Sequence, residues 1–309
     1  MQNQAKNHHY VPQFFLKGFS VDNKNLWVFD KVKKEFRYQD TRKIASENKF
    51  YTYKVRGKEE NLENVFGQIE GLAKAILNKV INKELVSEQE KADFAMFVAV
   101  SKVRVPDFKK WTEEGSEKMY KKINRMTFSS KERVKIMAEK AGKNLSDKEA
   151  DELVQFATDE NRYYVKFPPN YWLGTMLKLS LDVARAFIIA DWQFLYFNKK
   201  FALLTSDNPV ILVPPPDYDR FWGVGLLTPG VRHIFSLTSN ICLVIGDIKE
   251  NPQIEYRDMY DKDAYRWINK VTLLHSDRFT YSPEKGKLEK LVKENKERLK
   301  IRKERTVVS

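Results

Sequence analysis

The chain has 309 residues, of which 42% are hydrophobic and 13% aromatic. It is therefore long enough for one large core or two modest domains, and too apolar for a disordered protein. A single cysteine and four histidines exclude an internal disulfide and a cysteine-rich zinc site. The 55 basic and 42 acidic residues leave a net charge of +13, which indicates either a nucleic-acid or other polyanionic partner or a lysine-rich solvated surface.

Signals for secretion and for membrane insertion do not stand out in the sequence. No apolar run follows a basic stretch in the first nine residues, so we expect no signal peptide. The most apolar segment of helical length, residues 171–190, carries Lys178, Asp182 and Arg185, so we expect no membrane span. Cys242 lies inside an apolar run and suits a reducing compartment. These features predict a cytoplasmic protein.

The N-terminal third predicts short strands around a small helix. Pro12 suits the first position of that helix and Gly18 its end. Phe15 and Phe19 are four residues apart, so they face the core together. Residues 26–30 and 35–38 predict a hairpin, and residues 48–53 predict a further strand.

The middle of the chain predicts helices. Apolar residues recur at helical spacing over residues 62–80, and Ser87 with Glu90 forms a capping box that opens the next helix. Residues 107–165 predict charged, weakly periodic helices at 107–124, 130–142 and 146–160, which we interpret as a helical insert or lid. A long, well-packed helix follows at residues 171–191.

The C-terminal third returns to strands. Strand-like runs occur at residues 191–197, 201–213, 233–247 and 278–281, with a helix predicted at 260–276. From residue 284 onward ten basic residues face five glutamates, so this tail alone supplies +5 of the net charge. We predict an α+β fold: a mixed β core built from N- and C-terminal strands, with a large helical middle region. The domain prediction is one α+β domain over 1–283, with the insert at about 107–165, and a basic helical tail over 284–309.

Residues 205–210, Thr-Ser-Asp-Asn-Pro-Val, place polar groups between two apolar runs. Burying Asp207 and Asn208 without partners costs roughly 1–3 kcal/mol each, so the fold has to supply partners or a ligand. Pro209 removes a backbone donor and keeps Asn208 out of the helical region. Two interpretations remain open: a self-satisfied turn in which Asp207 caps its own backbone, or a binding site.

Two charged residues occur on or beside apolar helical stripes. Glu70 lies at the edge of the 62–80 stripe, and Arg104 continues the apolar face of the following helix. A core-facing arginine needs an anion, and Glu70 or Asp207 could supply it. The sequence leaves open whether Arg104 makes a buried ion pair or holds a ligand.

Several familiar catalytic patterns do not occur in the sequence. We find no phosphate-binding glycine loop, no dinucleotide fingerprint, no His-Glu-x-x-His and no Gly-x-Ser-x-Gly. His8 and His9 together with Glu70 and Asp207 could ligate a divalent metal ion. Adjacent residues of a strand point to opposite faces, so at most one of the two histidines would be a ligand or a base.

These residues carry a resemblance to a known family. The opening His8 to Phe14, Ile69-Glu70, Arg104 before Pro106, Thr205 to Val210 and Ile268-Asn269 resemble the bacterial family catalogued as domain of unknown function 4238. The resemblance runs from the first strand to about Tyr281. Val105 stands where the family more often has a threonine. The family implies no reaction, but it implies that the scattered polar residues belong to one recurring pocket.

We predict a phosphodiesterase or nuclease that acts on nucleic acid, in a defence or toxin setting. The predicted catalytic residues are His8, His9, Glu70 and Asp207, and the predicted substrate-binding residues are Arg104, Asn208 and Asn269. Histidine or carboxylate would activate water, and the arginine would hold phosphate. One alternative is a non-catalytic binding or interaction protein whose polar cluster is a buried structural network. A second alternative is a nucleotide-modifying transferase. The sequence indicates no oligomeric state.

Overall fold

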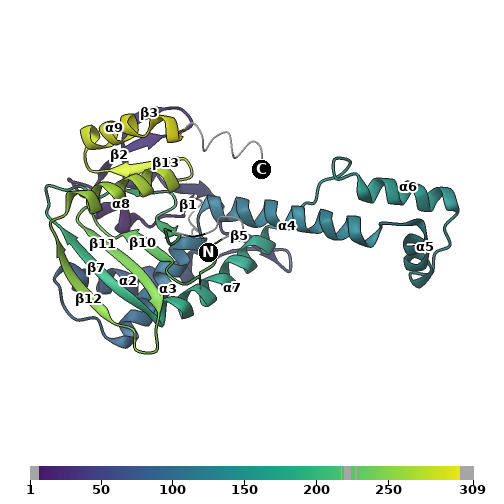
Figure 1. Ribbon diagram of the computed structural model, residues 1–309, viewed down its shortest axis with the longest axis horizontal. Coiled ribbons are helices and arrows are strands. Elements are labelled where there is room, and N and C mark those ends of the chain that lie inside the picture. Colours follow the sequence, from purple (N-terminus) through teal and green to yellow (C-terminus); the bar gives the residue numbers. More distant parts are fainter. Residues whose placement is uncertain (1–6, 217, 219–223, 227, 300–309) are drawn as a thin grey trace. The chain divides into compact units, whose positions relative to one another are not determined.

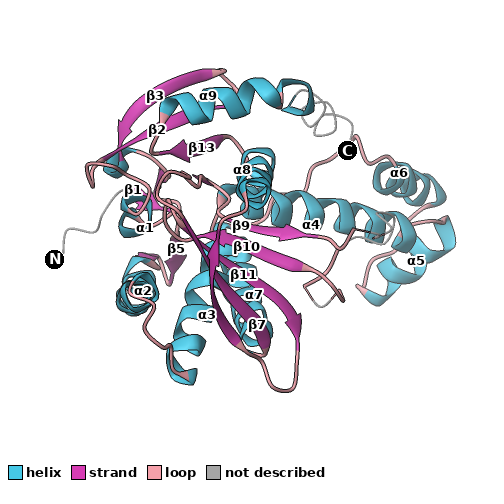
Figure 2. Ribbon diagram, turned by 60° about the vertical axis from the view of Figure 1, so that its left-hand side comes forward, coloured by secondary structure: helices cyan, strands magenta, loops and turns pink. Residues whose placement is uncertain are grey.

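The structure, a computed structural model, describes residues 7–216, 218, 224–226 and 228–299, so part of the predicted tail, 300–309, lies outside the described residues. Strands near both ends of the chain flank a central helical region, which confirms the predicted α+β fold (Figures 1 and 2). The chain forms two compact units. Unit 1 combines residues 1–107 with 176–309, and unit 2 comprises residues 108–175.

The larger sheet of unit 1 is built from the C-terminal half of the chain. Its strands lie in the order β12 (Ile254–Met259), β7 (Ala190–Phe197), β11 (Ile241–Ile248), β10 (Arg232–Ser236) and β9 (Val210–Val213). Neighbouring strands are antiparallel except for the parallel pair of β12 and β7. Apolar residues on both faces are buried, as expected for a sheet with helices on each side.

The second sheet joins the two ends of the chain. Its order is β3 (Glu35–Asp40), β2 (Asn25–Asp30), β13 (Phe279–Ser282) and β8 (Thr205–Ser206). Two small pairs complete the strands: β1 (Asn7–His9) with β4 (Ser46–Asn48), and β5 (Thr52–Val55) with β6 (Lys58–Asn61). Only residues 207–209 separate β8 from β9, so the polar turn is the point where the chain passes from one sheet to the other.

The helices of unit 1 cover these sheets. They are α1 (Gln13–Lys17), η1 (Thr41–Lys43), α2 (Glu63–Ile81), α3 (Glu88–Val103), the end of α7 (Pro169–Ile188), α8 (Lys262–His275) and α9 (Lys285–Glu294). The capping box of Ser87 and Glu90 opens α3 as predicted. Phe97 of α3 packs on Phe235, and Phe187 of α7 on His233, so these helices cover one face of the larger sheet.

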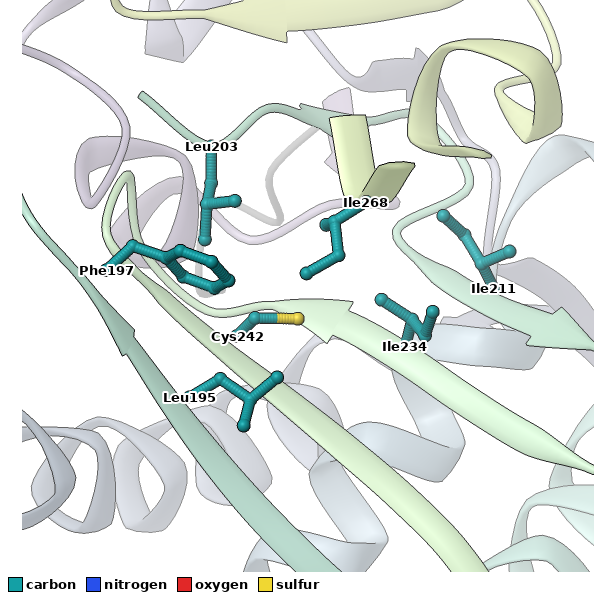
Figure 3. Packing of buried hydrophobic residues seen from close by; sticks show 7 residues of the cluster. All are labelled: Leu195, Phe197, Leu203, Ile211, Ile234, Cys242 and Ile268. Atoms are coloured by element: carbon teal, nitrogen blue, oxygen red, sulfur yellow. The ribbon is translucent and has the colours of Figure 1, made fainter. Parts of the chain in front are cut away.

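Helix α8 lies between the two sheets and organises the core. Figure 3 shows Ile268 of α8 above strands of the larger sheet, beside Cys242 and Ile234. On its other side, Leu273 of α8 packs in a second cluster that includes Leu288 of α9. Because Leu288 is fully buried, the first part of the predicted basic tail is packed on the core.

Unit 2 is helical. It contains most of α4 (Pro106–Thr127), α5 (Lys131–Lys140), α6 (Asp147–Thr158) and the start of α7. Ser146 and Glu149 form the predicted capping box of α6. Across both units, none of the helices in the described residues has the length and apolar character that a membrane span requires.

Candidate functional site

Asp207 is buried at the joint between the sheets and accepts three backbone hydrogen bonds. Its Oδ1 accepts from the N–H of Asp277 at 2.9 Å, and its Oδ2 accepts from those of Arg278 and Phe279 at 2.7 Å each. The carboxylate therefore holds the start of β13 against β8. The interpretation as a self-capping Asx turn is wrong, because the donors lie seventy residues or more further along the chain. The hydroxyl of Ser206 closes the local turn instead.

The ionisation of Asp207 is perturbed by its surroundings. Burial raises the pKa of this carboxyl to about 7, against the three amide donors, which lower it. Tyr10 and Tyr281 lie close enough to interact electrostatically with this carboxyl group. Burial raises the pKa of the Tyr10 phenol most and Asp207 next. Burial also raises the pKa of the Tyr281 phenol most, followed by Tyr10 and then Asp207. Asp207 is thus the titratable centre of a buried polar cluster.

Asp30, a residue that the sequence analysis did not single out, holds the same segment from the other side. It is fully buried and accepts from Nε of Arg278 at 3.1 Å and from Nη2 at 2.8 Å. Burial alone would raise the pKa of Asp30, but hydrogen bonds from Arg278, Lys33 and Val32 bring it below its ordinary value. The backbone of Arg278 is bound by Asp207 and its side chain by Asp30. The position of Asp30 directly after the apolar run 26–29 was the sequence signal that could have identified it as a buried carboxylate.

The two asparagines make structural ties. Asn269 is 4% exposed, and its side chain accepts from the N–H of Leu204 at 2.9 Å and donates to the carbonyl of Ala202 at 3.0 Å. Asn208 donates at 3.3 Å to the side chain of Asp107 and to the carbonyl of His275. Both side chains fasten neighbouring segments to the core.

The adjacent histidines have different environments. His8 is 1% exposed, its Nδ1 accepts from the N–H of Tyr51 at 2.9 Å, and its ring stacks on the Tyr51 ring. His9 is half-buried, and its Nε2 lies 3.4 Å from Nε2 of Gln13. Burial lowers the pKa of His9 most, and the charge of Arg104 also lowers it, while the carbonyl of Arg42, the charge of Glu70 and the carbonyl of Thr41 raise it in part. His9 is therefore largely neutral at pH 7 and able to accept a proton.

Arg104 is paired with Glu70. Its Nη1 donates to Oε1 of Glu70 at 2.8 Å and its Nε donates to the carbonyl of Tyr10 at 3.1 Å. The guanidinium also lies over the Phe66 ring, and its buried Nη2 has no hydrogen-bond partner within the described residues. The side chain of Arg104 is 1% exposed and that of Glu70 is 26% exposed, so solvent reaches the carboxylate of Glu70 and not the guanidinium of Arg104.

A second carboxyl group lies on the same helix. Glu63 is two turns before Glu70 in α2 and is half-buried. Burial raises the pKa of Glu63, Arg104 lowers it, and Glu70 raises it. Glu63 is not among the residues predicted from the sequence, although its seven-residue spacing from Glu70 places both on one helix face.

The structure therefore divides the predicted site. Glu70 and Arg104 lie close enough to His9 for their charges to shift the pKa of the histidine. We name these three residues the His9 group. Asp207 adjoins this group through Tyr10, whose side chain neighbours Asp207 and whose carbonyl binds Arg104. The side chains of His8, Asn208 and Asn269 are outside the His9 group and make hydrogen bonds to backbone groups of other segments.

Neither of two surface hollows of unit 1, with volumes of about 390 and about 250 Å³, is lined by any of the seven predicted residues. In the part of the chain that the structure describes, no group of three or more His, Cys, Asp or Glu side chains is arranged to hold a metal ion. What the His9 group can do chemically is accept a proton at the histidine beside an ion-paired carboxylate.

Comparison with known proteins identifies a family. The model described as a protein of unknown function, DUF4238, matches residues 7–286, so the chain belongs to this family. No significant match was found among curated proteins or among solved structures.

Proposed function

We propose that this member of a family of unknown function is a phosphodiesterase that acts on nucleic acid in the cytoplasm, with its chemistry carried by the His9 group and the neighbouring Glu63. The observation that carries the proposal is His9 itself. It is half-buried, its pKa is lowered by burial, and it lies beside Glu70 and Arg104. A neutral imidazole at pH 7 is the form that a general base requires.

The proposed step is hydrolysis of a phosphodiester bond. A ring nitrogen of His9 takes a proton from a water molecule while the water oxygen forms a bond to phosphorus. The bond from phosphorus to the leaving oxygen breaks, and that oxygen takes up a proton. Glu63 suits the proton donor, because burial raises its pKa. Arg104 is a positioning residue in this account, since it is buried and reaches the substrate only through Glu70.

The charge of the substrate would be met by exposed cations beside His9. Arg42 and Lys43 belong to η1, and the carbonyl of Arg42 acts on the His9 ring. The side chain of Arg42 is 65% exposed, although Asp40 neutralises part of its charge at 2.7 Å. Lys43 is exposed. A phosphate backbone favours such a surface, and the chain as a whole carries +13.

The experiment is a cleavage assay with purified protein and labelled single- and double-stranded RNA and DNA, with Mg²⁺, with Mn²⁺ and with chelator. We expect cleavage that His9→Gln reduces by at least about a hundredfold, the usual contribution of a general base. His275→Gln is the matched control, because His275 lies at the end of α8 outside the His9 group. No cleavage of any substrate by the wild-type chain, or equal cleavage by His9→Gln, would refute the proposal.

A second candidate is a non-catalytic nucleic-acid-binding or interaction protein. The observation in its favour is the closure of the rest of the polar cluster: His8, Asp207 and Asn269 are each less than 5% exposed and are hydrogen-bonded to backbone groups. Such satisfied groups are typical of a structural network. Salt-sensitive binding of nucleic acid without cleavage would favour this second function.

A further inference from the structure

A pocket of about 250 Å³ opens on the face of the larger sheet that α8 covers only in part. Its floor continues the hydrophobic cluster of Figure 3, since Leu195, Ile234 and Ile268 belong to both. Its rim carries polar and aromatic groups that the His9 group does not include: Gln193, Arg232, Arg257 and Trp267.

The two arginines of the rim have no anionic partner among the residues that the structure describes. Arg232 lies on β10 and Arg257 on β12, and both are exposed. Three inter-strand spacings, roughly 14 Å in total, separate these two strands. Two arginine side chains that extend toward each other from these strands can contact the same ligand. Neither guanidinium makes a hydrogen bond or ion pair with any described residue. Glu255, two residues before Arg257 on β12 and therefore on the same face, accepts a hydrogen bond from Gln193 at 3.0 Å.

Trp267 supplies an aromatic wall. It stands on α8 next to the buried Ile268, is 44% exposed, and lines the pocket. An exposed indole next to two unpaired guanidiniums is a combination that recognises a planar base joined to a phosphate. Open sheet faces that carry aromatic and basic side chains bind single-stranded nucleic acid in this way.

We propose that this pocket binds a nucleotide unit, with the base against Trp267 and phosphate paired with Arg232 and Arg257. The same chemistry is offered by a free mononucleotide and by one unit of a single strand. The inference does not rest on the His9 group, because the two sites share no residue.

The test is a binding titration on the full chain. A labelled single-stranded oligonucleotide of RNA and one of DNA are followed by fluorescence anisotropy, with the probe checked for integrity after the titration. Adenosine monophosphate and inorganic phosphate are titrated by calorimetry. The variants are Arg232→Gln combined with Arg257→Gln, and Trp267→Leu. Arg266→Gln is the matched control, since Arg266 is an exposed arginine of α8 that pairs with Asp263.

We expect the double arginine variant and Trp267→Leu each to weaken binding about tenfold, and Arg266→Gln to leave it within about twofold. Tighter binding of the oligonucleotides than of the mononucleotide identifies a single strand as the ligand, and equal binding identifies a free nucleotide. Loss of affinity with the arginines but not with Trp267, or equal binding of inorganic phosphate, would reduce the pocket to an anion patch and overturn the proposal. Absence of binding by the wild-type chain would overturn it as well, while the cleavage assay stands or fails separately.

Discussion

Replacing Asp207 with asparagine tests whether this carboxylate is structural. The variant keeps one oxygen for the N–H of Asp277 but brings an amide NH₂ group to the N–H donors of Arg278 and Phe279, which now lie 2.7 Å from Oδ2. Each buried donor left without an acceptor costs about 1–3 kcal/mol. We therefore expect the free energy of unfolding, measured at about pH 5, to fall by about 4 kcal/mol. For a unit of this size that corresponds to a fall in Tm of about 10 °C.

The assay is thermal unfolding followed by circular dichroism, with Asp277→Asn as the matched control. Asp277 is exposed, and within the described residues its side chain makes no hydrogen bond or ion pair that the same chemical change would remove. We expect its Tm to stay within about 1 °C of the wild type, as for most surface substitutions. An Asp207→Asn variant that melts like Asp277→Asn would refute the structural account of Asp207. Loss of cleavage with an unchanged Tm would instead place Asp207 in the catalytic machinery.

Three further outcomes follow from the geometry. Burial raises the pKa of Asp207 to about 7, so protonation of this carboxyl favours the folded state. This contribution to the free energy of unfolding is present in full below about pH 4 and is lost as pH rises toward 7. The Tm advantage of the wild type over Asp207→Asn should therefore shrink over that range, and an advantage that grows would show that the amide donors outweigh burial. Arg104→Met should lower stability by about 3 kcal/mol, measured by urea unfolding, because it leaves Glu70 and the Tyr10 carbonyl unpaired; a loss below about 1 kcal/mol would contradict the pairing. Since burial lowers the pKa of His9, the acid limb of the cleavage rate should have its midpoint below pH 6.5, and a midpoint above that value would contradict the assignment of His9 as the base.

The helices were predictable because their apolar residues repeat at helical spacing. That spacing, with the capping boxes of Ser87 and Ser146, located α2, α3, α5 and α6 to within a few residues. The assignment of strands to sheets was not predictable. Residues 201–213 look like one strand, turn and strand, yet β8 and β9 enter different sheets. Their partners β13 and β10 lie far along the chain, and local pattern carries no information about such pairing.

The site was predictable only where both partners lie on patterned helices. Glu70 and Arg104 each lie on or beside an apolar stripe, so their pairing was one of the options that the sequence offered. The partners of Asp207 are backbone amides of residues 277–279, and no side-chain pattern marks an amide as a donor. Strand alternation predicted that one histidine at most would be reactive, but tertiary packing decided that His8 is enclosed by Tyr51 and that His9 is half-buried.

The central claim is that the polar residues divide into a structural joint around Asp207 and a reactive group around His9. Cleavage rate and Tm, measured on the same preparations of His9→Gln and Asp207→Asn, test it most directly. We predict that His9→Gln abolishes cleavage with a Tm within about 2 °C of the wild type, whereas Asp207→Asn lowers the Tm, measured at about pH 5, by about 10 °C. The claim is contradicted if His9→Gln melts as early as Asp207→Asn, or if it cleaves at the wild-type rate.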